Sequence, residues 1–196
     1  MKKGRLEAFS DGVLAIIITI MVLEIKVPHG SDDFNALIPL LPVFLSYTLS
    51  FIYIGIYWNN HHHMLHGTQK ISGSILWANL HLLFWLSLVP FVTGWMGENH
   101  FAYSTLALYG FVLFMAAVSY TILQQMIIKT NGKDSLSSIA VGKDLKGKIS
   151  IVFYVIAIPA SFFIPVIAAS LYILVALIWL IPDKRIEHAL EKRSSI

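Results

Sequence analysis

Four histidines lie within the eight residues Asn59–His66, whose sequence is Asn-Asn-His-His-His-Met-Leu-His. Imidazole nitrogens bind transition metals and exchange protons near neutral pH. His62 and His66 are four residues apart and could share a helix face, as metal-binding pairs do. Membrane di-iron enzymes, however, use several separated histidine boxes, whereas this sequence has one such cluster. We therefore expect no metal site and no enzyme activity, and interpret the cluster as a polar helix end.

A second group of candidate residues consists of charges beside the first apolar stretch. Only 12 uncharged residues separate Asp11 from Glu24, which is about 18 Å of helix against a hydrocarbon core of ~30 Å. Ionisable side chains at such depth cost roughly 2.5–3.5 kcal/mol each and usually face a bundle interior or a water-filled cavity. Arg5 and Asp11 are six residues apart, nearly opposite on a helix, so each should reach a neighbouring helix. Snorkelling at the membrane edge is the alternative.

The composition places these residues in a membrane protein. The chain is 57% hydrophobic and 13% charged, with a mean hydropathy of +0.72, whereas soluble domains are about 45–50% apolar and about 25% charged. The basic residues form no single patch, so nucleic-acid binding is not expected despite an isoelectric point near 9.1. The absence of cysteine from these 196 residues excludes disulfides, thiolate nucleophiles and cysteine-bound metals.

Six apolar stretches predict six transmembrane helices, over residues 6–27, 37–60, 73–96, 103–128, 147–163 and 165–182. The last two are short and meet at Phe162-Phe-Ile-Pro165, where proline favours a break, so a tight hairpin is predicted. One merged helix is the alternative. The predicted fold class is an all-α integral membrane protein, with residues 1–196 in a single domain.

The distribution of basic residues predicts the orientation. In the six-span arrangement, 13 of the 14 Lys and Arg residues fall on one side and only Lys26 on the other. By the positive-inside rule both termini are then cytoplasmic, whereas five spans would put the last four basic residues outside. Glu24, Asp32 and Asp33 would form an acidic outer mouth.

One face of the first helix combines aliphatic residues with a single hydroxyl. Steps of three and four place on this face Phe9, Gly12, Ile16, Thr19, Leu23 and Lys26. The alternative interpretation of Ile16, Thr19 and Leu23 is an ordinary packed helix face.

The motif Arg5-x-x-x-Phe9-Ser10-Asp11, followed by this apolar run, resembles that of the transmembrane protein 175 family of potassium channels. Asn79-x-His81 and Leu88-Val-Pro90-Phe-Val-Thr93 resemble the family's third helix, so the resemblance covers the first three predicted spans. It implies a polar network beneath a pore, which holds the first helix against its neighbours. The matching or candidate residues are Arg5, Phe9, Ser10, Asp11, His62, His63, Asn79 and His81; which histidine joins the network stays open.

The resemblance further implies a homotetramer in which the first helices of four subunits surround a central pore. The 196 residues hold no second copy of Phe-Ser-Asp, so the other pore helices must come from other chains. Ile16 and Leu23 would form aliphatic gate or filter constrictions that exclude water when narrow, with Thr19 as the polar exception. The filter sequence Thr-Val-Gly-Tyr-Gly is missing, so side chains would have to select potassium.

The predicted function is a potassium-selective cation channel in the cell membrane, with potassium as the permeant ion and no cofactor. A proton-coupled transporter is the alternative, because intramembrane groups such as Asp11 and the histidines also mark proton relays. A six-span unit without an internal repeat, however, lacks the usual transporter architecture. A membrane histidine–metal enzyme is a third possibility, and it would require bound iron or zinc.

Overall fold

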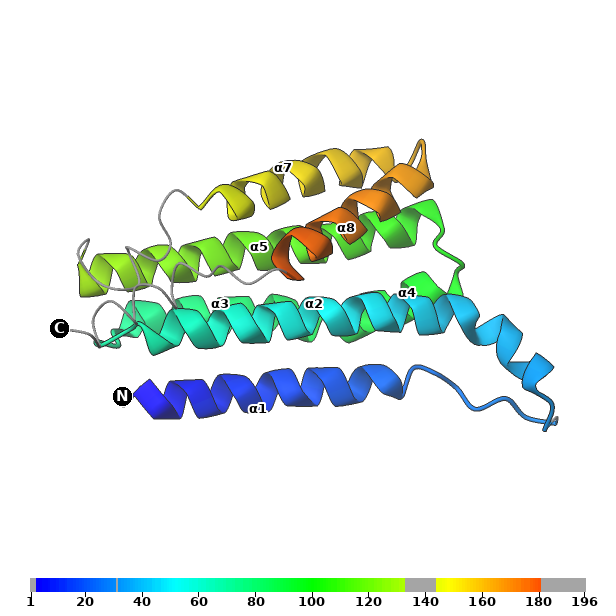
Figure 1. The fold of residues 1–196 in the computed structure, drawn as a ribbon, viewed down its shortest axis with the longest axis horizontal. Coiled ribbons are helices and arrows are strands. Elements are labelled where there is room, and N and C mark those ends of the chain that lie inside the picture. Colours follow the sequence, from blue (N-terminus) through cyan, green and yellow to red (C-terminus); the bar gives the residue numbers. More distant parts are fainter. Residues whose placement is uncertain (1–2, 31, 133–143, 181–196) are drawn as a thin grey trace.

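The structure, a computed structural model, describes residues 3–30, 32–132 and 144–180. Every regular element in these ranges is helical, which confirms the predicted all-α class. In order, the elements are α1 (Lys3–Val22), η1 (Phe34–Leu40), α2 (Leu41–His66), α3 (Gly73–Ser87), α4 (Val89–Glu98), α5 (Tyr103–Asn131), α7 (Leu145–Ala160) and α8 (Pro165–Leu180). If α3 and α4 are taken together as one interrupted helix, the successive long helices run antiparallel along one long axis (Figure 1).

Caps and prolines set several helix boundaries. The Ser72 hydroxyl caps α3 by accepting the backbone N–H of Ile75 at 3.4 Å. α3 and α4 are nearly continuous and are interrupted where Pro90 cannot supply the backbone N–H of an interior helical residue. α7 and α8 are separate helices joined by residues 161–164, and Pro165 begins α8. The chain therefore makes a hairpin here rather than one merged helix.

Each of the six predicted stretches contains a helix, although the ends differ. α1 ends at Val22 rather than at residue 27, and α2 continues to His66 rather than stopping at residue 60. Histidines in the last turn of α2 suit the negative end of the helix dipole. Within the described residues, three segments are long and apolar enough to cross a membrane by length and composition, namely Phe34–His66, Gly73–Glu98 and Tyr103–Asn131, and α8 is a shorter apolar helix. Residues 181–182 of the last predicted span lie outside the described residues.

α5 packs against α3, α4, α7 and α8 and forms the centre of the described bundle. Two glycines let helices approach closely, as small residues do in membrane proteins. A Cβ at Gly110 would overlap the Tyr172 hydroxyl, and a Cβ at Gly97 would lie 2.7 Å from the Val43 Cα. The buried Tyr172 hydroxyl donates to the Leu106 carbonyl at 3.1 Å, so this crossing of α5 and α8 leaves no hydroxyl unsatisfied.

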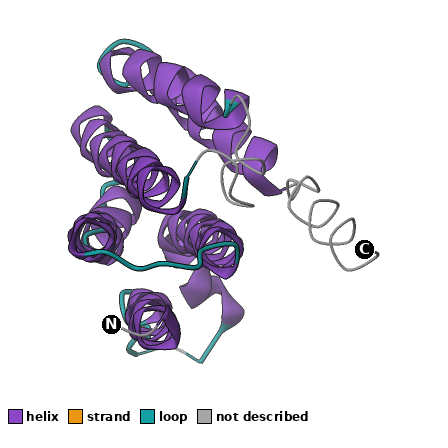
Figure 2. Cartoon of the chain, turned by 90° about the vertical axis from the view of Figure 1, so that its left-hand side faces the viewer, coloured by secondary structure: helices purple, strands orange, loops and turns teal. Residues whose placement is uncertain are grey.

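α1 lies at one edge of the bundle. It packs on α2, α3 and α4, and α7 lies at the opposite edge in both the side view and the view along the helices (Figures 1 and 2). One side of α1 is therefore left uncovered by the described chain.

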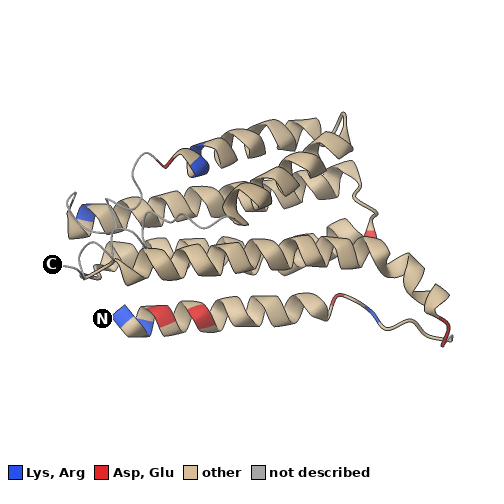
Figure 3. Ribbon diagram, in the orientation of Figure 1, with Lys and Arg blue, Asp and Glu red and all other residues tan. Residues whose placement is uncertain are grey.

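Charged residues lie toward the two ends of the bundle (Figure 3). Lys and Arg are found at the end that holds the N-terminus, except for Lys26 in the loop after α1. The other basic residues that support the predicted orientation fall within residues 1–2, 133–143 and 181–196, outside the described residues.

Candidate functional site

The two faces of α1 differ in what covers them. The buried face carries Leu6, Ser10, Leu14, Ile17 and Met21, each at most 4% exposed. On the other side Phe9 is 52% exposed, Ile16 58% and Leu23 67%, and Gly12, Thr19 and Lys26 are exposed as well. Leu23 and Lys26 follow the end of the helix. The six residues predicted to share a face thus form the side that a single chain leaves uncovered.

Thr19 places an oxygen acceptor on this aliphatic face. Its Oγ1 lies 2.9 Å from the Ile16 carbonyl oxygen and 3.1 Å from that of Ala15. The hydroxyl hydrogen is donated to the helix's own backbone, which leaves the oxygen lone pairs available. A cation on this face would therefore meet an oxygen between aliphatic side chains.

A chain of buried hydrogen bonds holds the other face of α1. Asn79 Nδ2 donates to Ser10 Oγ at 2.9 Å, and Asn79 Oδ1 lies 2.7 Å from His61 Nε2. Because that amide oxygen can only accept, the hydrogen must be on His61 Nε2. The Ser10 hydroxyl in turn donates to the Leu6 carbonyl at 2.9 Å. Ser10 and Asn79 are fully buried and His61 is 2% exposed, so this chain joins α1, α3 and α2 inside the core.

The histidine in this chain is His61, and the candidates His62 and His63 lie elsewhere. The exposed His62 ring stacks between Trp58 and His66, with ring centroids 6.4 Å and 6.1 Å away. His63 meets His62 edge-on at 5.9 Å. Within the described ranges, no three metal-ligating side chains converge on one point.

The helical period of α2 could have predicted that His61 is the buried histidine. It precedes Met64 and Leu65 by three and four residues, and both are apolar residues of the buried face of α2. Each residue turns a helix by about 100°, which takes His62 off that face. His81 also lies outside the chain, because it is exposed and its Nε2 accepts the Trp85 indole N–H at 3.0 Å.

The two charges of the motif, Arg5 and Asp11, have different surroundings. Asp11 Oδ1 accepts the indole N–H of Trp58 on α2 at 3.1 Å. Arg5 is exposed, and no hydrogen bond or ion pair joins it to another residue of the described ranges. Ser10 and Asp11 therefore bind α1 to its own chain, whereas Arg5 and the half-exposed Phe9 face its surroundings.

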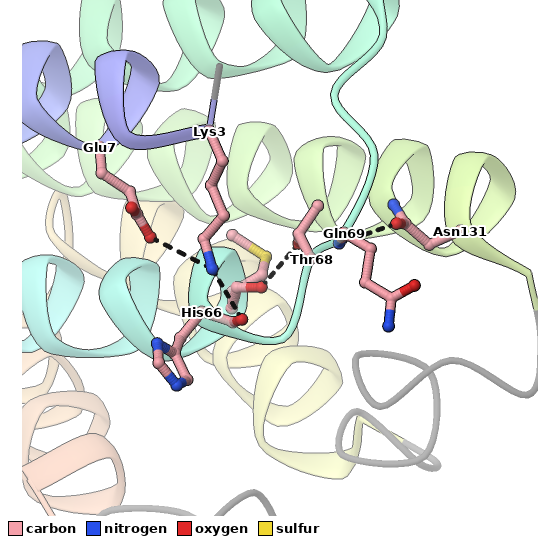
Figure 4. Close-up of polar contacts among 7 residues, drawn as sticks. Lys3, Glu7, His66, Thr68, Gln69 and Asn131 are labelled. Carbon is pink, nitrogen blue, oxygen red and sulfur yellow. Dashed lines mark hydrogen bonds and ion pairs between the residues drawn. The ribbon is translucent and has the colours of Figure 1, made fainter.

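The first turn of α1 is tied to the turn between α2 and α3 (Figure 4). Lys3 Nζ lies 2.8 Å from the His66 carbonyl oxygen and 3.7 Å from Glu7 Oε1. A basic side chain on the last carbonyls of a helix is stabilising. Beyond this contact, Asn131 Oδ1 at the end of α5 accepts the backbone N–H groups of residues 69–70 at 3.0 Å and 2.8 Å. The pair of Lys3 with Glu7 has the i,i+4 spacing of a helical ion pair. No sequence spacing signals the other contacts, because their partners are backbone groups.

The three acids predicted for the outer mouth lie at the other end of the bundle (Figure 3). Glu24 lies against α4, where a Cβ at Gly94 would be 3.2 Å from Glu24 Oε2. Asp33 caps η1 by accepting the Asn35 side-chain N–H at 2.8 Å and its backbone N–H at 3.2 Å. The bond from the Asn35 side chain, and to a smaller extent the bond from its backbone N–H, hold the pKa of the Asp33 carboxyl below its ordinary value. Asp33 therefore stays ionised at neutral pH, beside the exposed Asp32.

These features define an α-helical membrane protein whose first helix has one face anchored by buried polar groups and one face left open. The sequence profile of the family described as the endosomal/lysosomal potassium channel TMEM175 matches residues 5–90. A protein of Chryseobacterium sp. named as a potassium channel is 61% identical over 192 residues, which cover 98% of this chain and 100% of that protein. The chain belongs to the TMEM175 family.

A solved structure and a vertebrate relative extend the comparison. A crystal structure described as a lysosomal potassium-selective channel TMEM175 homologue from Chamaesiphon minutus superposes with a TM-score of 0.78 at 26% identity, and the match covers 92% of this chain and 97% of that one. A Danio rerio protein named as an endosomal/lysosomal proton channel TMEM175 is 42% identical over 81 residues, which are 35% of this chain and 16% of that protein. The relatives are thus named for ion conduction rather than for an enzymatic reaction.

We expect Asn79→Leu to lower the thermal stability of the protein. The new side chain has a similar size, but it leaves His61 Nε2–H and Ser10 Oγ without their buried partner, at a cost of about 1–3 kcal/mol for each group. Unfolding of the purified protein in detergent, followed by tryptophan fluorescence, should shift by about 2–4 °C for each kcal/mol lost. The matched control is His81→Leu, which removes an exposed ring two residues away and should melt like the parent. Equal melting of all three proteins would show that the buried chain does not stabilise the fold.

Proposed function

We propose that the chain is the subunit of a homotetrameric, potassium-selective channel in the cell membrane, and that four copies of α1 surround its central pore. One observation carries the proposal: α1 buries one face in its own chain and leaves Phe9, Ile16, Thr19 and Leu23 exposed on the other. The potassium-channel names of the relatives support the choice of ion. Since one helix cannot enclose a path, other copies of the chain must complete the pore wall.

Selection and gating follow from the side chains of this face. In a ring of four subunits, Ile16 and Leu23 form two aliphatic constrictions about 10 Å apart along the pore. Such constrictions exclude water when they are narrow, and so they gate by dewetting. The Thr19 oxygen lies between them and can replace part of an ion's hydration shell. Sodium holds its water more strongly than potassium and therefore meets the higher barrier. The mechanism needs no cofactor.

The proposed channel domain comprises residues 1–196 and crosses the membrane six times. The spans are α1, η1 with α2, α3 with α4, α5, α7 and α8. Glu24, Asp32 and Asp33 then lie at the extracellular mouth, where their negative charges raise the local concentration of potassium. The lipid bilayer surrounds the remaining helices.

The first test of this arrangement is the location of the termini, which are both proposed to be cytoplasmic. The basic residues at that end of the described bundle are Lys3, Arg5, Lys70, Lys129, Lys146 and Lys148. Epitope tags at either terminus should be inaccessible in intact cells and accessible after permeabilisation. Labelling of either tag from outside intact cells would contradict the proposed arrangement of six spans with both termini in the cytoplasm.

Ion flux through the purified protein in liposomes tests the function itself. We expect potassium flux at channel rates, discrete openings in single-channel recordings, and much slower sodium flux. Proton conduction is the second candidate, because the Danio rerio relative is named as a proton channel. A pH-sensitive dye in the same liposomes, with the potential clamped by a potassium ionophore, measures that flux. Potassium flux that is absent, or that occurs only with a pH gradient, would reject a potassium channel.

Substitutions along α1 test the pore face. Ile16→Asn supplies a donor and an acceptor at similar size, so it should hold water in the constriction, raise conductance severalfold and reduce discrimination against sodium. Thr19→Val removes the hydroxyl at nearly constant shape and should reduce the current. Ile17→Asn is the matched control, since Ile17 is 4% exposed, and it should mainly lower the yield of folded protein. Parent-like conductance and selectivity in Ile16→Asn and Thr19→Val would place the pore elsewhere.

A further inference from the structure

A groove borders α1 on the side of α4. It has a volume of about 600 Å³ and is lined by Ile16, Ile20 and Glu24 from α1 and the turn after it, and by Phe91 and Trp95 from α4. Phe91 is 63% exposed and Ile20 is 43% exposed. The groove walls are thus mainly apolar, with two carboxylates, those of Glu24 and Glu98, among them.

An aromatic ridge borders α1 on the side of α2. It consists of Phe44, Tyr47 and Phe51, whose neighbouring rings lie 6.4 Å and 6.1 Å apart. Phe44 is 51% exposed and Phe51 is 44% exposed. Trp58 follows Phe51 by seven residues, two helical turns, and so continues the same face. Because Trp58 donates to Asp11 of α1, the face that carries the ridge runs alongside α1.

The ridge and the groove lie on different sides of α1. Ser50 on α2 faces Thr93 on α4, with their hydroxyl oxygens 2.6 Å apart. The next residue, Phe51, is turned from Ser50 by about 100° and is therefore directed away from α4. In the view along the helices, α1 lies at the edge of the bundle (Figure 2). The ridge on α2 therefore borders one side of α1, and the groove beside α4 borders another.

The ridge and the groove also lie at the same height along the helix axes. Ser50 is level with Thr93, and Ser46 is level with Gly97, where a Cβ would lie 2.5 Å from the Ser46 hydroxyl. α2 and α4 run in opposite directions, so residues 44–51 of the ridge correspond in height to residues 92–99, a range that includes Trp95 of the groove. Subunits related by rotation about an axis parallel to the helices share this height.

We propose that the aromatic ridge of one subunit packs into the groove of the next, and that this contact closes the ring around the pore. The inference rests on the proposed channel function, and it names the surfaces that join the subunits. Ridge and groove are different surfaces of one chain, so the contact is heterologous and generates a closed ring if the rotation closes. Repetition of the contact turns the open face of every α1 toward the same axis.

A second copy fits the groove better than a lipid chain does. Glu24 and Glu98 line the groove, and an acyl chain would leave both carboxylates without a polar partner, which is costly in a membrane. The ridge carries one hydroxyl, that of Tyr47, for which no hydrogen bond to another described residue is found. In the proposed contact, Tyr47 can donate to Glu24 of the next copy, while the rings of Phe44 and Phe51 pack between Phe91 and Trp95.

Disulfide cross-linking tests the contact, because the sequence contains no cysteine. The variant Phe51→Cys/Phe91→Cys, oxidised in membranes, should give covalent dimers, trimers and tetramers that collapse to monomers on reduction. Each single-cysteine variant should stay monomeric, since a heterologous contact does not bring two identical residues together. The matched control is Ile52→Cys/Phe91→Cys, whose first cysteine lies about 100° round α2 from the ridge and should give no ladder.

A second pair, Phe44→Cys/Trp95→Cys, repeats the test one to two turns nearer the outer end and covers the case in which the first pair fails to fold. Absence of a ladder from both folded pairs, or dimers from a single-cysteine variant, would overturn the proposed contact. Potassium flux measured on the reduced variants separates the two proposals. Flux without a ladder rejects this interface and leaves the channel standing, whereas a ladder without flux supports the interface and counts against the channel.

Discussion

The rotation of α1 about its own axis depends on one buried amide. Asn79 on α3 satisfies Ser10 on α1 and His61 on α2 at the same time, and all three side chains are inside the core. An unpaired polar group costs more in such a medium than in water, so rotations that break these bonds are opposed. Holding Ser10 inward turns Ile16 and Thr19 outward, because they lie on the other side of the helix. In the proposed channel, the bonds made on the buried face of α1 therefore decide which face is directed toward the ions.

α1 is held to its own chain at both ends as well as in the middle. In its N-terminal half Lys3 reaches the last carbonyl of α2, and Asp11 accepts the indole N–H of Trp58. Just after its C-terminal end Glu24 fits against α4 where Gly94 has no side chain. The charges at the ends of α1 thus have specific neighbours in the chain, with the exception of the exposed Arg5. A helix fixed along its length can hold narrow constrictions at constant diameter.

The outward face of α1 supports the proposal that other copies of the chain complete the channel. In lipid no hydrophobic effect drives the burial of aliphatic side chains, so the exposure of Ile16 and Leu23 alone would need no explanation. Thr19 between them, and charges at both ends of the same face, are unusual for a surface in contact with acyl chains. The proposed ring supplies an aqueous axis for this face, while Phe44 and Phe51 on the flank pack against the next copy. Conduction in this proposal is a property of the assembly rather than of the chain.

The sequence by itself determined the all-helical class, the helix positions and the uncovered stripe of Phe9, Ile16 and Thr19, since these depend on local composition and on the period of 3.6 residues. It did not determine which histidine meets Asn79. The period of α2 places His61 on the buried face, but only the packing of α3 brings the Asn79 amide within reach of both His61 and Ser10. Only the tertiary structure decided the bonds of Lys3 to the His66 carbonyl and of Asn131 to the backbone of residues 69–70, because backbone acceptors and donors are the same at every residue and leave no pattern in a sequence. The groove beside α4 likewise depends on the distance between helices, which no local period encodes.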